Sequence, residues 1–374
     1  MGEIVFDDAL EPPRSQRSDA PMSNMPKQPV FDGHNDVLLK LWKYADHKDA
    51  VSQFIAGCAG HIDVPRSQKG GFAGGFFAIY VPSPDLGIDM DADMIKPAYD
   101  LPLPGPVEYQ DALPIALSQA AILLEMERQG AVKICHQVSD IRNAHKAGVM
   151  AAIMHMEGAE AIATDLEALD VFYAAGLRSL GPVWSRPTIF GEGVPFRFPS
   201  DGDIGEGLTD VGRALIRKCN ELGVLVDLSH LNEKGFWDVA EISDAPLVAT
   251  HSNACSISLQ ARNLTDAQLK AIGDSKGMVG LNFATAFLRP DGKMLRETPL
   301  SDMLAHLDHM IAICGEDHVG LGSDFDGATV PVGITDVAGL PRLVQAMRDH
   351  GYSTTRIDKL CFENWMSVLE RTWK

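Results

Sequence analysis

Short apolar runs alternate with longer amphipathic stretches along most of the chain. Eight of the apolar runs have the length of β-strands, and most are nearly continuous, which is typical of parallel strands covered on both faces. They lie at residues 29–32, 75–81, 149–154, 177–180, 224–228, 246–250, 277–283 and 318–322. The pattern therefore predicts a parallel sheet in the interior of the protein.

Helices are predicted between these strands. Residues 113–129 carry apolar side chains at helical spacing. Thr209 begins a second amphipathic stretch that ends before Gly223, and Thr265 with Gln268 has the spacing of a capping box. Strands that alternate with helices predict an α/β protein, and eight such units are the number found in a closed (β/α)8 barrel.

The segments outside this alternation suggest how the chain is organised. Residues 1–28 are rich in Pro, Ser and charge and are predicted to form an extended arm, whereas residues 29–374 form one barrel domain. Two long segments interrupt the barrel pattern, the Pro- and Asp-rich residues 82–112 and the Gly- and Pro-rich residues 185–208. Loops of this length are usually lids, binding loops or disordered segments.

The composition indicates which kinds of binding partner are not expected. The chain of 374 residues has 51 acidic and 32 basic side chains, a formal net charge of -19. Nucleic acids and anionic membrane surfaces both favour basic faces, so neither is an expected partner. The six cysteines lie far apart without a CxxC pair, which favours isolated thiols in a reducing compartment. The start of the chain lacks the features of a signal peptide, and a cytoplasmic location is predicted.

Candidate ligands follow five of the predicted strands. His34 and Asp36 follow the first strand, Glu157 the third, His230 the fifth, His251 the sixth and Asp324 the eighth. In a closed barrel these side chains would meet at the carboxyl ends of the strands, where barrel enzymes have their active sites. Each residue alone has an ordinary structural interpretation, such as a packed histidine or a turn-forming Asp. His155, two residues before Glu157, is interpreted as a packed core residue.

This set of side chains suits a metal centre. Imidazoles together with carboxylates are typical of zinc or a similar first-row metal. Five ligands are more than one catalytic ion with an open position needs, whereas two ions about 3.5–4 Å apart fit the number better. A carboxylate such as Glu157 would bridge them, and Asp324 would be free to act as acid and base. Arg262 and Asn263 could form an anion clamp, although alone they would be surface residues.

Eight motifs, in order, resemble the renal (membrane) dipeptidase family, which consists of zinc peptidases of the amidohydrolase superfamily. The resemblance extends from about residue 30 to the AsnTrpMetSerValLeu segment at 364–369. The motifs are PheAspGlyHisAsnAsp, HisIleAspValProArg with GlyGlyPhePheAlaIleTyr, MetGluGlyAla, ValAspLeuSerHis, ThrHisSerAsnAla, ArgAsnLeuThrAsp and GlyLeuGlySerAspPheAspGly.

The resemblance implies a distorted (β/α)8 barrel with two zinc ions that hydrolyses dipeptides and related amides, including dipeptides with a C-terminal D-residue. It implies that a hydroxide bridging the metals attacks the peptide bond and that Asp324 transfers the proton. The implied ligands are His34 and Asp36 for the first zinc, Glu157 as the bridge, and His230 and His251 for the second zinc. Arg262 would bind the C-terminal carboxylate of the substrate, with Asn263 beside it. A homodimer is the family's expected assembly.

One position departs from the family pattern. Many members have a histidine, which helps to hold the substrate carbonyl, at the place that matches Trp184. An indole can only donate a hydrogen bond. Two alternatives therefore stay open: a hydrolase of the same fold that acts on another small amide, and a catalytically silent metal-binding homologue.

Overall fold

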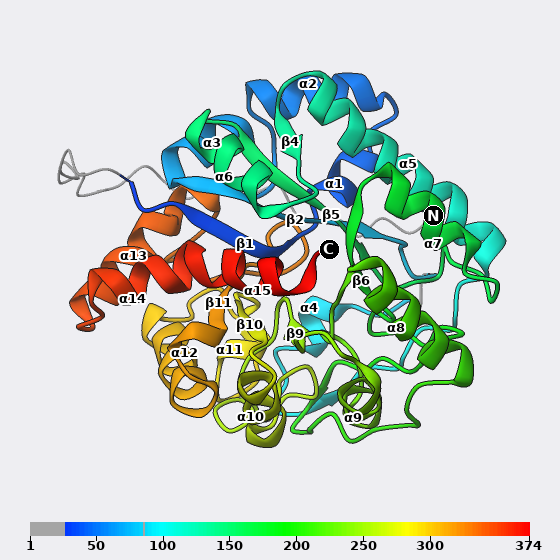
Figure 1. Ribbon diagram of the computed structural model, residues 1–374. Helices are drawn as coiled ribbons and strands as arrows, with labels where there is room; N and C mark the ends of the chain where they lie inside the picture. Colours follow the sequence, from blue (N-terminus) through cyan, green and yellow to red (C-terminus); the bar gives the residue numbers. More distant parts are fainter. Residues whose placement is uncertain (1–26, 85–86) are drawn as a thin grey trace.

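Eight parallel strands form a closed barrel in the computed structural model, which describes residues 27–84 and 87–374. All but residues 27 and 28 of the predicted arm lie outside this part of the chain, so the division into an arm and one barrel domain stays a prediction. Figure 1 shows the strands near the centre, with helices around them. The predicted (β/α)8 fold is confirmed.

The barrel strands follow one another in the order β8-β6-β5-β2-β1-β11-β10-β9. The ring closes between β8 and β9, where the backbone N–H of Leu228 donates to Val248 O over 2.8 Å. The barrel strands are β1 (Val30–Asn35), β2 (Phe72–Tyr80), β5 (Met150–Glu157), β6 (Leu177–Gly181), β8 (Leu225–Val226), β9 (Val248–Ala249), β10 (Met278–Asn282) and β11 (Val319–Gly322). Each of the eight corresponds to a predicted strand.

The helices occupy the connections between the strands and the C-terminal segment. Their bounds are α1 (Val37–Trp42), α2 (His47–Ala56), α3 (Val64–Gly70), α4 (Met90–Asp93), α5 (Tyr109–Arg128), α6 (Val138–Lys146), α7 (Glu167–Ala175), α8 (Asp210–Leu222), α9 (Glu233–Ile242), α10 (Asp266–Asp274), α11 (Thr285–Leu288), α12 (Leu300–Cys314), α13 (Leu340–Asp349), α14 (Thr354–Asp358) and α15 (Asn364–Thr372). Short turns of other helix types are η1 (Glu316–His318), η2 (Val337–Gly339) and η3 (Lys359–Glu363). The predicted capping box of Thr265 and Gln268 is present at the start of α10.

The core has two layers, because alternate strand residues face the inside and the outside of the barrel. The inner cluster contains strand residues such as Phe31, Phe76 and Ile153, packed against Trp365 of α15. Trp365 also donates its indole N–H to Leu321 O over 3.0 Å. A side chain at Gly33 would lie 2.2 Å from Thr250 O and 2.6 Å from the Trp365 ring, so only glycine fits there. The C-terminal helix therefore closes one end of the barrel.

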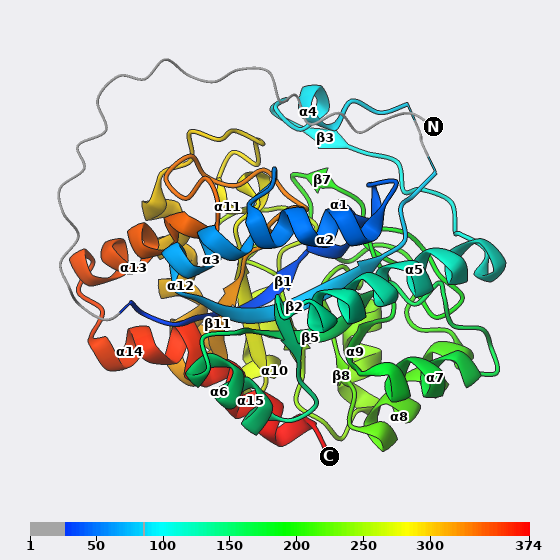
Figure 2. The same ribbon diagram turned by 90° about the horizontal axis from the view of Figure 1, so that it is seen from above.

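The two long segments predicted as loops pair with each other. They contain β3 (Tyr99–Asp100) and β7 (Arg197–Phe198), which form a two-stranded antiparallel sheet. Tyr99 packs with Phe287, which follows β10, in a small apolar cluster. In Figure 2 this sheet lies at one end of the molecule, and α15 lies at the opposite end.

Two further details differ from the predicted strands. β1 and β5 extend three residues beyond the predicted ends, so His34 and Glu157 lie within strands rather than after them. A ninth strand, β4 (Val132–Ile134), pairs with β5 outside the barrel order. It is only three residues long, and its central Lys133 is exposed, which gives too little apolar pattern to predict it.

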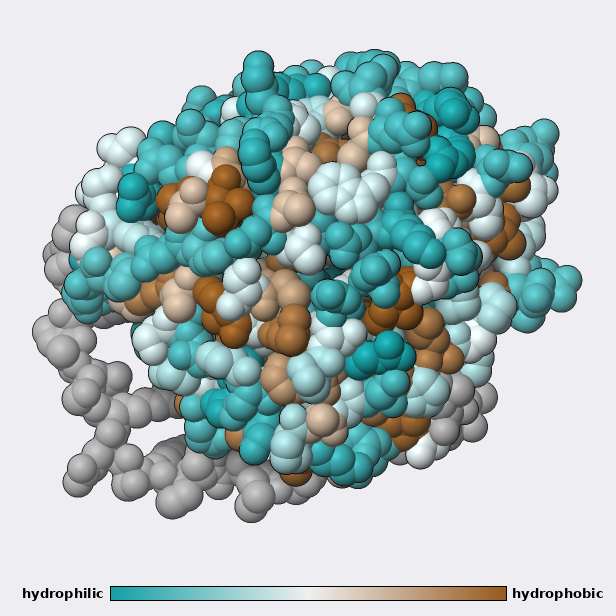
Figure 3. All heavy atoms as spheres, turned by 90° about the horizontal axis from the view of Figure 1, so that it is seen from below, coloured by the Kyte–Doolittle hydropathy of each residue, from teal (hydrophilic) through white to brown (hydrophobic). Residues whose placement is uncertain are grey.

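The surface and the cysteines agree with an ordinary globular protein. All six cysteines are free, as predicted, and five of them are buried. Within the described residues, no helix has both the length and the apolar character needed to cross a membrane. The face in Figure 3 is mostly hydrophilic, with apolar residues in small separate groups.

His306 of α12 is a buried histidine that the structure holds neutral. Its Nδ1 accepts a hydrogen bond from Ala254 N over 3.1 Å, and its Nε2 lies 2.9 Å from Leu288 O, to which it can donate. Both ring nitrogens are used by a neutral imidazole in this arrangement. Burial lowers the pKa of His306 to about 4.

Acid should therefore destabilise the fold through His306. The pKa in the unfolded chain is about 6.5, so as the pH falls from there toward 4 the unfolded state takes up the proton first. The free energy of unfolding should fall by up to about 3 kcal/mol from this residue. Urea unfolding with a chelator present, at pH 7 and pH 4, should show a smaller loss for His306→Gln than for the wild type. Equal losses would contradict the assignment.

Candidate metal centre

All six predicted side chains meet at the carboxyl ends of the barrel strands. They come from five strands and the few residues after them: His34 in β1, Asp36 just after it, Glu157 at the end of β5, His230 four residues after β8, His251 two after β9 and Asp324 two after β11. The first five are buried, and Asp324 is partly buried. Their roles are taken up under the proposed function.

Glu157 lies at the centre of this cluster. Its Oε2 is 3.6 Å from Nε2 of His34, whereas its Oε1 is 3.0 Å from Nε2 of His230 and 3.4 Å from Nε2 of His251. Nε2 of His230 and Nε2 of His251 lie 3.1 Å apart, and these two residues form the second histidine group. Oε2 is therefore nearest to His34 and Oε1 to His230 and His251, although His34 and His251 also adjoin each other, with ring centres 3.9 Å apart.

The first group is completed by Asp36, whose Oδ2 lies 3.4 Å from Nε2 of His34. Both ring nitrogens of His34 are buried without a hydrogen-bond partner. Asp324 also approaches, because single ligand atoms of His34, Asp36 and Asp324 lie within 4.8 Å of one another. Gly327 permits this approach, since a side chain there would lie 2.0 Å from Asp36 Oδ2.

These spacings fit a metal site. Zinc binds imidazole nitrogen and carboxylate oxygen at about 2.0–2.2 Å in a tetrahedral arrangement, which places neighbouring ligand atoms roughly 3.3–3.6 Å apart. The distances around Glu157 lie close to that range, and most are too long for good hydrogen bonds. Nε2 of His34 has no hydrogen-bond partner and lies beside the carboxylates of Asp36 and Glu157, so it can offer its lone pair to a cation.

The cluster is electrostatically costly as a set of bare side chains. Burial raises the pKa of Glu157 well above its usual value and also raises the pKa of Asp324. Burial alone would lower the pKa of His34, but the charges of Glu157 and Asp36 outweigh it and raise the pKa to about 10. The carboxylates therefore require positive charge nearby, which a cation would supply.

Two of the residues adopt a backbone conformation that side chains disfavour. His230 has φ 69° and Asp324 has φ 58°, both in the left-handed region. Neighbouring hydrogen bonds hold them there: Val194 N donates to His230 O over 2.8 Å, and Asp324 N donates to His34 O over 3.0 Å. Backbone strain of this kind is concentrated at functional sites.

The predicted substrate-binding residues lie around this cluster in different ways. Arg262 is buried, its Nη2 donates to His251 O over 3.2 Å, and its Nε has no partner. Burial lowers the pKa of Arg262 to about 10. The amide of Asn263 instead donates to the carbonyls of Ser258 and Phe287, each over 2.9 Å. Its predicted contact with a substrate stays a prediction.

Trp184 lies against the second histidine group. Its ring centre is 5.6 Å from that of His230, 5.2 Å from that of Tyr80 and 5.6 Å from that of Phe196. Arg186 is fully buried and forms an ion pair of 2.7 Å with Glu160, which fixes the segment after Trp184. The indole therefore forms part of an aromatic wall.

Three residues that the sequence did not indicate lie within hydrogen-bonding distance of the predicted site residues. The amide of Asn282 donates to Asp324 Oδ2 over 2.9 Å. Ser185 Oγ lies 2.8 Å from His230 Nδ1, and Thr250 Oγ1 lies 2.8 Å from His251 Nδ1. Asn282 could have been found, because it is a polar residue near the carboxyl end of the predicted strand 277–283, which had no candidate of its own.

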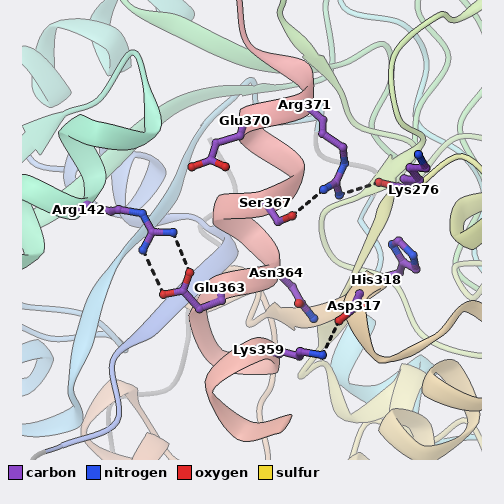
Figure 4. Close-up of a pocket in the computed structure, with 10 residues that line it drawn as sticks. All are labelled: Arg142, Lys276, Asp317, His318, Lys359, Glu363, Asn364, Ser367, Glu370 and Arg371. Carbon is purple, nitrogen blue, oxygen red and sulfur yellow. Dashed lines mark hydrogen bonds and ion pairs between the residues drawn. The ribbon is translucent and has the colours of Figure 1, made fainter. Parts of the chain in front are cut away.

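A hollow of about 590 Å³ lies elsewhere, around α15. It is at the amino-terminal side of the barrel, because Lys276 lies two residues before β10 and His318 directly precedes β11. Figure 4 shows two ion pairs among its charged side chains, Arg142 with Glu363 and Lys359 with Asp317. It does not contact the metal cluster.

A closed barrel with a buried cluster of histidines and carboxylates at the carboxyl ends of its strands defines the class of metal-dependent barrel hydrolases. Comparison with known proteins gives the family within that class. The sequence model of membrane dipeptidase (peptidase family M19) matches residues 22–374. The chain belongs to this family of metallo-dipeptidases.

Three individual proteins show how similar this chain is to known sequences and structures. The crystal structure of a metallo peptidase from Rhodobacter sphaeroides, liganded with a phosphinate mimic of the dipeptide L-Ala-D-Ala, has a TM-score of 0.90 and 56% sequence identity, covering 93% of this chain and 100% of that one. Dipeptidase tcpJ of Claviceps purpurea is 29% identical over 90% of this chain and 76% of its own. An uncharacterized protein in the pqqA 5' region of Klebsiella pneumoniae is 47% identical over 71% of this chain and 98% of its own.

Proposed function

We propose that this protein is a dipeptidase with two zinc ions bridged by Glu157. His34 and Asp36 would hold one ion and His230 and His251 the other, with Glu157 shared between them. The observation that carries the proposal is that the two oxygens of Glu157 face different histidines, with Oε2 at 3.6 Å from His34 and Oε1 at 3.0 Å from His230. When bound, the zinc ions would supply the Lewis acidity that polarises a carbonyl and makes water nucleophilic near neutral pH.

Asp324 is proposed as the acid and base. It would take a proton from the attacking water on its carboxylate and pass that proton to the leaving amine nitrogen. Two features support this role: the amide of Asn282 donates to Oδ2 over 2.9 Å, and burial raises the pKa of the carboxyl above its usual value. A carboxyl with a raised pKa takes up a proton more readily than an ordinary Asp, which suits proton transfer.

Arg262 is proposed to bind the C-terminal carboxylate of the substrate. It is a buried guanidinium whose Nε has no partner, and such a group gains most from an anion. A clamp on the terminal carboxylate close to the reacting atoms would admit only very short peptides. The family assignment implies dipeptides, and the mimic bound by the Rhodobacter relative supports a D-residue at the C-terminal position.

A second candidate is a hydrolase of the same fold that acts on another small amide. It is favoured by Trp184, which stands where the family resemblance implies a histidine and whose ring centre lies 5.6 Å from that of His230. A catalytically silent homologue is less favoured, because the complete set of ligands and Asp324 is retained. A cytoplasmic location and a homodimer stay predictions from the sequence.

A small substrate panel tests the proposal. The zinc-loaded protein should hydrolyse L-Ala-D-Ala, and L-Ala-D-Ala amide should be cleaved with a kcat/KM about 10–100-fold lower, because a charged hydrogen bond is worth about 1.5–3 kcal/mol. L-Ala-L-Ala reports the stereochemical preference, and a chelator should abolish all cleavage. Equal rates for the free dipeptide and its amide would contradict the role of Arg262. Bound zinc without any dipeptide cleavage would favour the second candidate.

Replacing Asp324 with Asn separates chemistry from metal binding. The amide cannot accept the proton, so kcat for L-Ala-D-Ala should fall at least 100-fold. Zinc content, measured by plasma mass spectrometry, should stay at two per chain, since Asp324 is not one of the five proposed ligands. Unchanged kcat would show that another group transfers the proton.

A further inference from the structure

We infer that Asp227 is a positioning residue that determines which nitrogen of His251 faces the metal centre, and that it acts through the hydroxyl of Thr250. Asp227 directly follows β8, and Thr250 directly follows β9, so the two lie side by side where the barrel closes. Both are buried. The inference rests on the proposed zinc centre, in which His251 is a ligand.

Asp227 is surrounded by hydrogen-bond donors. Its Oδ1 accepts from the backbone N–H of Ser229 over 3.0 Å and of Thr250 over 2.8 Å. Its Oδ2 lies 2.6 Å from Thr250 Oγ1. An ionised carboxylate can only accept hydrogen bonds, so the single hydroxyl proton of Thr250 is donated to Asp227.

The same hydroxyl then determines which ring nitrogen of His251 carries the proton. Thr250 Oγ1 is 2.8 Å from Nδ1 of His251, and it has no second proton to donate. Nδ1 of His251 must therefore carry the proton, which leaves the lone pair of the neutral ring on Nε2. Nε2 is the atom that faces Glu157 Oε1 at 3.4 Å. A metal ligand needs this free lone pair, and such outer hydrogen bonds orient metal-binding histidines.

A second histidine faces the same oxygen of Asp227. Nε2 of His155 lies 3.5 Å from Asp227 Oδ2 and has no hydrogen-bond partner, while its Nδ1 is 2.9 Å from Ser179 Oγ. His155 packs edge-on against His34, with ring centres 5.5 Å apart. His155, which the sequence predicted to be a packed core residue, therefore lies between Asp227 and His34.

The variant Asp227→Asn should reverse the direction of the two hydrogen bonds that link Asp227, Thr250 and His251. The two backbone N–H groups keep the amide oxygen at Oδ1, so the amide nitrogen replaces Oδ2 and donates to Thr250. The Thr250 hydroxyl is then free to donate to Nδ1 of His251, which moves the ring proton to Nε2. Zinc must displace that proton, and binding at this half of the centre should weaken about 10–100-fold.

Two measurements test this without relying on turnover. Long-range ¹H–¹⁵N correlation of metal-free protein labelled in histidine reports the tautomer, with the His251 signal assigned by His251→Gln. Competition with a zinc chelator gives the affinity for each of the two zinc ions. Thr250→Val removes the hydroxyl without reversing the chain and should also weaken one zinc, whereas Thr250→Ser keeps the hydroxyl and should restore the wild-type affinity.

The outcomes distinguish this inference from the proposed function. Wild-type protein that binds fewer than two zinc ions would contradict the zinc centre itself. Two zinc ions bound with wild-type affinity in both Asp227→Asn and Thr250→Val, with the proton of His251 still on Nδ1, would overturn the positioning role. If Asp227→Asn does not fold by circular dichroism, the pair Thr250→Val and Thr250→Ser decides.

Discussion

The architecture depends on one constraint, the burial of several carboxylates in a single cluster. Asp36 and Glu157 are buried and Asp324 partly so, and burial raises the pKa of the last two. Ionised groups are stable inside a protein only when opposite charge compensates them. Arg262 supplies one positive charge close by, and a metal centre would supply the rest. The positions of the surrounding histidines follow from that requirement.

The barrel brings residues that are far apart in the sequence together in this cluster. The five proposed ligands come from four strands, and each lies within a strand or no more than four residues after its carboxyl end. Trp365 packs the opposite end of the interior, and the small sheet of β3 and β7 lies near the ligand end. The left-handed backbone of His230 and Asp324 is tolerated because neighbouring strands and loops hold it.

The eight barrel strands could be predicted from the sequence, because buried parallel strands are continuous apolar runs. The convergence of the ligands could be predicted as well, because the carboxyl ends of the strands meet at one end of a barrel. The sequence was insufficient where the pattern is short or non-local. β3 and β7 have two residues each and pair across about a hundred positions, which no local pattern encodes. The contacts of Asp227, Thr250 and Asn282 depend on side-chain geometry, although Asn282 ends a predicted strand. Asn263 was paired with Arg262 because they are adjacent, yet their side chains contact different groups.

The most direct test of the central claim is a crystal structure of the zinc-loaded protein, with data collected on both sides of the zinc absorption edge. The account predicts two anomalous peaks, one on each side of Glu157, the first beside His34 and Asp36 and the second beside His230 and His251. A single peak, or two peaks bound through other residues, would contradict the claim that this carboxylate bridges a two-zinc centre.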